Sequence, residues 1–212
     1  MAELLNAQIS NSQKAIDLLR EGQIVALPTE TVYGLAALAS NEQAVAKIFT
    51  AKNRPRDQPL SICIFTPEQA QDICILSPLA KRLIDAFWPG PLTLVLPKKP
   101  DAKIADNALE NLTSIGVRCP DIAWRQDFIK LGFTTPLVLS SANTSGQPSP
   151  LTAQTVMEDI GDKIPLILDD GPCRAGMDST IISIENESAT LLRKGALRVE
   201  DFASFPMNWV QT

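Results

Sequence analysis

The stretch that decides the fold class is residues 60–97, LSICIFTPEQAQDICILSPLAKRLIDAFWPGPLTLVLP. Its two ends, LSICIF and LTLVLP, are short continuous apolar runs, which are typical of strands buried on both faces. The segment between them predicts a helix, because Ser77 suits the N-cap and Pro78 suits the first helical position. The sequence PGP at 89–91 ends that helix. A strand, a helix and a second strand therefore follow one another in this stretch.

The same alternation extends toward the N-terminus. Residues 10–21 place apolar side chains at helical spacing, and Gly22 follows where a helix C-cap is expected. The run QIVALP at 23–28 predicts a short buried strand. A second helix is predicted for residues 41–52, with Asn41 as its N-cap.

The alternation also extends toward the C-terminus. The last two apolar segments, STIISI and ATLLRK, are separated by the polar turn ENES and predict a hairpin. Before the hairpin, the sequence predicts strands and helices in turn, at residues 114–119 (strand), 124–131 (helix), 136–141 (strand), 152–160 (helix) and 165–170 (strand).

This order of elements predicts an α/β fold in which helices cover a sheet. Two pairs of strands have no helix between them, namely the runs at 92–97 and 113–119 and the two arms of the final hairpin. Some pairing must then be antiparallel, so we expect a twisted mixed (parallel and antiparallel) sheet with flanking helices. The clearest loop, residues 97–107, is too short for a domain boundary, and a single domain over residues 1–212 is expected.

Composition excludes several classes of chemistry. The chain has 212 residues, of which 45% are hydrophobic and 20% charged, with a mean hydropathy of +0.04, as expected of a globular protein. It has no histidine, which excludes Ser-His-Asp and Cys-His catalysis and zinc sites built on histidine. A net charge of -5 repels nucleic acid and anionic membranes, although it leaves room for a local basic cleft.

Cysteine usage and the N-terminus point to the cytoplasm. The four cysteines are far apart and form no CxxC pair, so we expect reduced, mostly buried thiols. The N-terminus lacks the basic segment and apolar run of a signal peptide, and no apolar run approaches the roughly 18 residues of a membrane span. The cysteines are Cys63, Cys74, Cys119 and Cys173.

Three segments carry candidate chemistry. PTETVYG at 28–34 follows a predicted strand, and ligands of open α/β sheets bind at the carboxyl ends of strands. KNRPR at 52–56 gathers three cations that suit a polyphosphate. SSANTSG at 140–146 offers hydroxyls and amides to phosphate oxygens. Each segment also fits a structural role: a capped turn, a solvated helix C-terminus or an ordinary polar turn.

In their order along the chain, these segments resemble a known family. The blocks PTETVYGL, KNRPRDQPLSI, WPGPLTLVL, GVR, SSANTSGQPS, DSTIIS and LLRKGAL resemble the YrdC-like family of threonylcarbamoyl-AMP synthases, of the single-domain TsaC, YrdC and YciO type. The resemblance runs from about Ile9 to Leu197. It implies a mixed sheet curved around a concave basic cleft.

The resemblance implies an adenylyl transfer. L-threonine, bicarbonate and ATP, with Mg²⁺, would give threonylcarbamoyl-adenylate and pyrophosphate for the t6A modification of tRNA. Such a reaction needs positioning and charge neutralisation more than a histidine base. The partners implied are these substrates and, beyond them, tRNA or the t6A-transfer machinery, without a membrane.

The resemblance also assigns the nucleotide-side residues. Lys52 and Arg54 match the family's KxR motif and are expected to be catalytic and to bind the ATP phosphates. Ser141 and Asn143 match the SxN motif. Further residues expected on ATP are Arg56, Gln58, Ser149 and Arg193.

The threonine-side residues follow in the same way. Arg118 is expected to pair with the substrate carboxylate, beside Thr31 and Ser179. Cys63 is expected in the same pocket, at a position where many relatives have histidine, and Asp178 stands where proline is common. These two departures bear on the threonine pocket rather than on ATP binding.

Two other functions remain open at the level of sequence. A protein of this fold could bind a nucleotide or double-stranded RNA without synthase activity, and steep salt dependence would reveal such RNA binding. A carbamoyl transferase domain that uses carbamoyl phosphate is the other alternative, but such domains usually occur in larger chains with zinc-binding cysteine pairs. The retained Thr31, Arg118 and Ser179 and the negative net charge favour the synthase.

Overall fold

A computed structural model describes residues 1–110, 112–185, 187–205 and 208–210 of the chain. The described strands, in chain order, are β1 (Glu3–Asn6), β2 (Val25–Leu27), β3 (Gly34–Leu38), β4 (Ser61–Cys63), β5 (Leu92–Pro97), β6 (Ser114–Arg118), β7 (Leu137–Ser141), β8 (Leu166–Asp169), β9 (Thr180–Glu185), β10 (Ser188–Arg193) and β11 (Asn208–Val210). The helices are α1 (Ile9–Arg20), α2 (Glu42–Lys52), α3 (Ala70–Ile73), α4 (Pro78–Phe87), α5 (Ala123–Lys130) and α6 (Ala153–Ile160), with short 3-10 helices η1 (Pro67–Gln69), η2 (Asp106–Ala108) and η3 (Val199–Phe202).

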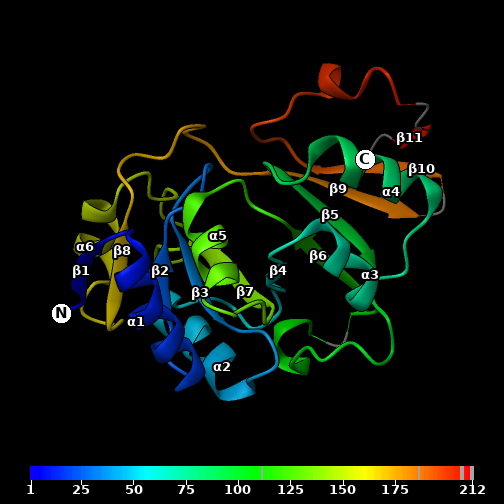
Figure 1. The fold of residues 1–212 in the computed structure, drawn as a ribbon. Helices are drawn as coiled ribbons and strands as arrows, with labels where there is room; N and C mark the ends of the chain where they lie inside the picture. Colours follow the sequence, from blue (N-terminus) through cyan, green and yellow to red (C-terminus); the bar gives the residue numbers. More distant parts are fainter. Residues whose placement is uncertain (111, 186, 206–207, 211–212) are drawn as a thin grey trace.

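The described strands form one open, twisted sheet in the order β1-β8-β2-β3-β7-β4-β6-β5-β9-β10-β11 (Figure 1). The sheet is mixed, as predicted: β2, β3, β7 and β4 run antiparallel to one another in turn, whereas β1 and β2 lie parallel to β8. The two strand pairs that the sequence predicts without a helix between them, β5 with β6 and β9 with β10, are both antiparallel. Asn186, in the predicted ENES turn, lies outside the described residues.

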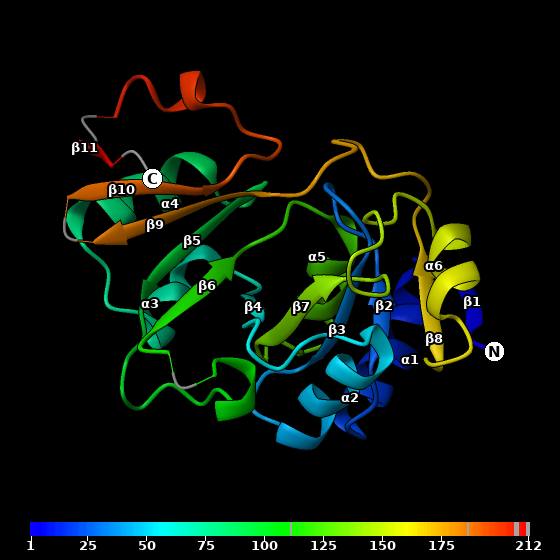
Figure 2. The same cartoon turned by 180° about the vertical axis from the view of Figure 1, so that it is seen from behind.

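Helices cover both faces of the sheet because its strands are apolar on both sides. In β2, Val25 and Leu27 belong to one hydrophobic cluster, together with residues of α1 and α5. Ala26, which points to the opposite face, belongs to a second cluster with residues of α2, α4 and α6. Figure 1 shows α5 in front of the sheet, and Figure 2 shows α2 and α6 in front of the other face.

The predicted helix signals are present in the structure. The side chains of the predicted caps Asn41 and Ser77 each accept a hydrogen bond from the backbone N–H three residues ahead, so they cap α2 and α4. Thr152, at the start of a predicted helix but not predicted as its cap, caps α6 in the same way. Gly22 has a φ of +72° after α1, a conformation that glycine adopts without strain. At the end of α2, Asn53 has a φ of 49°, in the left-handed region, and ends the helix just before Arg54.

Some elements are not predicted by the sequence. The strand β3 is one of them, although it pairs with β2 and β7 and makes the PTETVYG segment the connection of a hairpin. The short elements β1, α3 and β11 and the 3-10 helices η1, η2 and η3 are also not predicted. All four cysteines are free; Cys63, Cys74 and Cys119 are buried and Cys173 is half-buried. No helix among the described residues is long and apolar enough to cross a membrane.

Candidate active site

Three segments that are far apart in the sequence meet at the centre of the sheet. The connection 28–33 lies between β2 and β3, and Gly34 at the start of β3 is paired with Ser141 at the end of β7. The C-terminal end of α2 reaches the same place, because the backbone N–H of Ser145 donates to the carbonyl of Lys52 over 2.7 Å. The fold thus brings together the three segments in which the sequence predicts chemistry.

Two cavities open at this junction, and they share Arg54 and Ser141. They are called below the amino-acid cavity and the phosphate cavity, after the ligands that the sequence leads us to expect in them. The amino-acid cavity has a volume of about 210 Å³ and includes Cys63, Arg118, Ser179 and Arg193. The phosphate cavity has a volume of about 450 Å³; it is lined by Lys52, Asn53, Arg54, Pro55, Gln58, Ser141, Asn143, Ser145, Gly146, Gln147 and Ser149.

Lys52 holds the loop that follows β7. Its side chain is buried, and its ammonium donates to the backbone carbonyls of Ser141 and Asn143, the latter over 2.7 Å. Burial, together with the positive charge of Arg54, lowers the pKa of Lys52 to about 8. Lys52 therefore brings a positive charge to the phosphate cavity and at the same time fixes the loop that lines it.

The loop after β7 is also held from its other side. The Asn143 amide donates to the carbonyls of Thr144 and Gln147, over 2.9 and 2.7 Å. Asp159 on α6 accepts from both the backbone N–H and the hydroxyl of Thr144, over 2.8 and 2.7 Å. The polar residues of SSANTSG thus stabilise the shape of the loop that lines the phosphate cavity.

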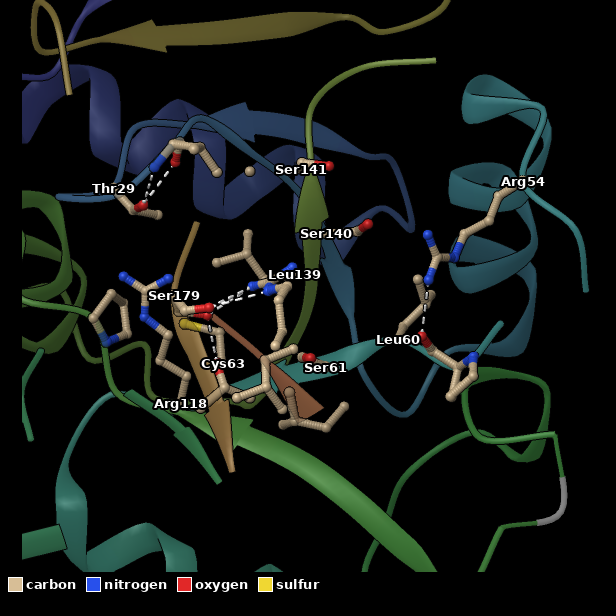
Figure 3. A pocket seen from close by; sticks show the side chains of 18 residues that line it. Thr29, Arg54, Leu60, Ser61, Cys63, Arg118, Leu139, Ser140, Ser141 and Ser179 are labelled. Atoms are coloured by element: carbon tan, nitrogen blue, oxygen red, sulfur yellow. Dashed lines mark hydrogen bonds between the residues drawn. The ribbon is translucent and has the colours of Figure 1, made fainter. Parts of the chain in front are cut away.

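Arg54 lies where the two cavities join. Its Nε donates to the carbonyl of Gln58 over 3.1 Å, and its Nη2 donates to the carbonyl of Pro59 over 3.1 Å. Figure 3 shows Arg54 reaching into the cavity from the end of α2, on the side opposite Arg118. Burial lowers the pKa of Arg54, but an arginine stays charged at neutral pH.

Arg118, at the end of β6, is fixed by two segments. Its Nε donates to the carbonyl of Gly90 over 3.2 Å, and its Nη1 donates to Oγ1 of Thr31 over 2.8 Å. Its Nη2 lies 2.7 Å from Oε1 of Glu30 in a buried ion pair. Since each Nη carries two protons, the guanidinium keeps donors beyond these contacts.

Ser179, which is labelled in Figure 3, forms a second polar group in the amino-acid cavity together with Arg193. The Ser179 hydroxyl lies 2.7 Å from that of Thr93 and accepts from Nη2 of Arg193 over 3.0 Å. The Nη1 of Arg193 lies 3.9 Å from Oδ1 of Asp178, whose carboxylate also accepts from the Ser149 hydroxyl. Asp178 thus connects a residue of the phosphate cavity with one of the amino-acid cavity.

The structure brings most of the predicted site residues together. Lys52, Gln58, Asn143 and Ser149 line the phosphate cavity; Cys63, Arg118, Ser179 and Arg193 line the amino-acid cavity; Arg54 and Ser141 line both. Arg193, which is predicted to bind ATP, lies beside Ser179 in the amino-acid cavity. Thr31 lines neither cavity and contacts Arg118.

Arg56 lies apart from the two cavities, whereas Cys63 is buried, as the sequence predicts for most of the cysteines. Arg56 lines neither cavity, and its guanidinium lies 4.9 Å from the ring centroid of Phe49. Cys63 is 1% exposed, and burial raises the pKa of its thiol far above the ordinary value. Cys63 is therefore a packing residue at the wall of the cavity, not a nucleophile.

The sequence does not single out Glu30, Thr93 or Asp159 as residues that act in the site, and it marks Asp178 only as a departure from the family pattern. Glu30 lies within the PTETVYG segment, but the hydroxyls of that segment are what suggest a ligand. A single carboxylate in a connecting segment forms no sequence motif that would indicate a function. Its partner Arg118 comes close to it only in the folded protein. Thr93 is the one polar residue of the apolar run LTLVLP, which is the signal that could have drawn attention to it.

Comparison with known proteins identifies what the chain is similar to. Residues 17–195 match the sequence profile of the Sua5, YciO and YrdC family, which is described as "Telomere recombination". A threonylcarbamoyl-AMP synthase of Bacillus subtilis is 43% identical over 188 residues, which cover 88% of this chain and 54% of that protein. The structure of Sua5 from Pyrococcus abyssi complexed with L-threonine superposes with a TM-score of 0.91 at 38% identity, over 99% of this chain and 63% of that one.

A more distant structure supports the fold alone. Escherichia coli YciO superposes with a TM-score of 0.83 at 19% identity, and the match covers 95% of this chain and 100% of that one. The chain spans about half the length of the Bacillus and Pyrococcus synthases that it matches. The mixed open sheet with flanking helices is therefore shared with the longer Sua5 and with YciO, which the match covers completely.

Proposed function

Because the chain belongs to the Sua5, YciO and YrdC family, we propose that it acts as an L-threonylcarbamoyladenylate synthase. In this reaction L-threonine, bicarbonate and ATP give threonylcarbamoyl-AMP and pyrophosphate, which makes the protein a nucleotidyltransferase. The observation that carries the proposal is the pair of joined cavities, one of which suits an amino acid and the other a polyphosphate. A Sua5 relative at 38% identity binds L-threonine, which supports the first assignment.

The phosphate cavity has the chemistry that a triphosphate requires. Lys52 and Arg54 supply positive charge, and neither forms an ion pair within the described part of the chain. Ser141 and the loop after β7 add hydroxyl and amide donors. We assign the ATP phosphates to this cavity, with Gln58, Asn143 and Ser149 at its edge.

The amino-acid cavity suits a small hydroxylated amino acid. Arg118 offers its remaining N–H groups to the carboxylate of L-threonine. Ser179 and Thr93 place two hydroxyls in the same cavity, within reach of a polar side chain. Thr31 contributes indirectly, because it holds Arg118 in place.

The joining of the cavities fits the order of the chemistry. The threonine nitrogen is first carboxylated, with loss of water from bicarbonate, and an oxygen of the resulting carbamate then attacks the α-phosphorus of ATP. The bond from that phosphorus to the bridging oxygen breaks, and pyrophosphate leaves with the electron pair. Arg54 lies where the two cavities meet, so it is placed to stabilise charge on the reacting phosphate.

Magnesium and the later partners belong to the same proposal. In phosphoryl-transfer sites Mg²⁺ is usually bound through substrate phosphates and one or two carboxylates, so we expect it to enter with ATP. Asp178 is a carboxylate at the site, where it contacts both Ser149 and Arg193. The product would be passed to the machinery that modifies tRNA.

The test measures pyrophosphate release from ATP with Mg²⁺ and bicarbonate, with and without L-threonine. The proposal expects release that depends on L-threonine and does not occur with glycine. If ATP binds and no pyrophosphate is released at any threonine concentration, the synthase function is wrong, and nucleotide binding without catalysis takes its place. Binding of duplex RNA that weakens steeply between about 50 and 200 mM salt would instead support the RNA-binding alternative.

A further inference from the structure

The cations around the two cavities differ in whether a carboxylate neutralises them. In the amino-acid cavity Arg118 is paired with Glu30, and Arg193 lies near Asp178. Lys52 and Arg54, which line the phosphate cavity, have no such partner among the described residues. The arginines that line only the amino-acid cavity therefore have a carboxylate nearby, whereas Lys52 and Arg54, which is shared by both cavities, do not.

The pair of Glu30 and Arg118 is the more deeply buried of the two. The Glu30 side chain is 7% exposed and that of Arg118 is 11% exposed, against 34% for Asp178 and 42% for Arg193. The distance from Arg118 Nη2 to Glu30 Oε1 is 2.7 Å, without the alignment of a hydrogen bond. Oε2 of Glu30 is buried and has no hydrogen-bond partner in the described residues. The carboxylate is thus held by charge rather than by a network of donors.

We propose that Glu30 determines substrate specificity by cancelling the charge of Arg118, so that the amino-acid cavity prefers a zwitterion to a simple anion. This inference rests on the proposed function, in which the carboxylate of L-threonine meets Arg118. Glu30 does not line the cavity, so it acts through Arg118 and not by touching the substrate.

The reason is electrostatic. A buried arginine without a counterion attracts any small carboxylate or phosphate, because the low local dielectric strengthens the attraction. With Glu30 beside it, an incoming carboxylate is attracted by Arg118 and repelled by Glu30, so the neutral pair attracts it far less than a lone arginine would. A ligand that carries its own ammonium group is spared that repulsion. The cavity then admits L-threonine and disfavours anions of the same size.

The experiment compares two ligands of nearly the same shape. L-threonine is a zwitterion at neutral pH, whereas 3-hydroxybutyrate keeps its carboxylate and hydroxyl but has no ammonium. Binding of each is measured by calorimetry in the wild-type protein and in Glu30→Gln, which keeps the size of the side chain and removes its charge. The inference expects wild type to favour L-threonine at least tenfold, and Glu30→Gln to reduce that ratio at least tenfold because 3-hydroxybutyrate binds more tightly.

A purely structural role for Glu30 gives a different result. If Glu30 only supports the cavity, Glu30→Gln weakens both ligands by the same factor and leaves their ratio unchanged, and this outcome overturns the inference. The matched control is Glu187→Gln, the same carboxylate-to-amide change in the exposed ion pair with Arg82, for which the ratio is expected to stay as in wild type.

Two further measurements keep the test decisive. If Glu30→Gln does not fold, the wild-type ratio still decides, because equal affinity for 3-hydroxybutyrate and L-threonine contradicts charge cancellation. Pyrophosphate release by the wild type is measured alongside. Threonine-dependent release together with an unchanged ratio in Glu30→Gln overturns this inference alone, whereas absence of both threonine binding and release overturns the proposed function with it.

Discussion

Arg54 is the residue on which catalysis is expected to depend most, because it lines both cavities. Replacing it with alanine removes a positive charge at their junction. We expect Arg54→Ala to lower adenylate formation at least tenfold, which corresponds to about 1.4 kcal/mol of transition-state stabilisation. Pyrophosphate release at saturating L-threonine measures the effect.

Arg82→Ala is the matched control for this prediction. Arg82 lies on α4, where its Nη2 is 3.7 Å from a Glu187 carboxylate oxygen in an exposed ion pair. The control is expected to keep wild-type turnover. A folded Arg54→Ala protein with wild-type turnover would remove Arg54 from the reaction.

Lys52 gives the site a pH dependence. Its pKa is lowered to about 8, first by burial and then by the charge of Arg54, so the side chain is charged below pH 8 and largely neutral above it. Loss of this charge weakens the attraction for ATP phosphates. We expect the KM for ATP to rise at least threefold between about pH 7 and 9, at saturating L-threonine.

The variant Lys52→Met tests whether Lys52 is the group whose titration changes the KM for ATP. It has no ionisable group at this position, so its KM for ATP is expected to be high and nearly independent of pH over the same range. A pH-dependent rise of the same size in Lys52→Met would place the titrating group elsewhere.

The sequence predicted which residues line the site better than it predicted what they contact. It identified Lys52 from a motif, but the bonds from its ammonium to the Ser141 and Asn143 carbonyls arise only when α2 and β7 come together. Glu30 shows the same limit. Its pairing with Arg118 joins residues 88 positions apart (118 minus 30), and no local pattern encodes such a contact.

At the scale of elements, the close approach of β3 and β7 shapes the amino-acid cavity. A Cβ on Gly34 would lie 2.6 Å from Cδ1 and 2.8 Å from Cγ of Leu139, which is one of the residues lining the cavity. We expect Gly34→Ala to lower the free energy of unfolding by about 1–3 kcal/mol, the usual cost of overpacking. It should also push Leu139 into the cavity and raise the KM for L-threonine several-fold.

Urea unfolding and threonine titrations measure both effects of Gly34→Ala. Adding Leu139→Val to Gly34→Ala removes a methylene at the clash and is expected to restore part of the stability. Wild-type stability and threonine KM in Gly34→Ala would show that the two strands can separate without cost to the site.

Elements with strong local signals were predicted, and those without them were not. The capping residues Asn41, Ser77 and Thr152 mark helix starts through their own side chains, so the sequence located α2, α4 and α6 to within a residue or two. The strand β3, GLAAL, is short and buried along most of its length, and it lacks the polar alternation that distinguishes a strand. The strand β1 is mostly exposed and pairs with β8 alone among the described strands, so its sequence gives little sign of it.

At the scale of the whole molecule, the sequence predicted the class of sheet and not its order. Alternating strands and helices indicate α/β structure, and adjacent strand pairs indicate antiparallel neighbours. The placement of β7 between β3 and β4, which brings Ser141 to Gly34, depends on packing between distant segments. The candidate site residues came from the family resemblance and not from periodicity. The family motifs lie far apart in the sequence, and only this strand order brings them together.

The central claim is that the two joined cavities combine parts of three substrates into one adenylate and release pyrophosphate. The most direct measurement supplies the protein with ATP, Mg²⁺, L-threonine and ¹³C-bicarbonate, and follows the product by mass spectrometry. The account predicts threonylcarbamoyl-AMP whose mass is one unit higher, because it contains one ¹³C atom from bicarbonate. This product forms only when all three substrates are present. Pyrophosphate release without an isotope-labelled adenylate, or no adenylate from a protein that binds both ATP and L-threonine, would contradict it.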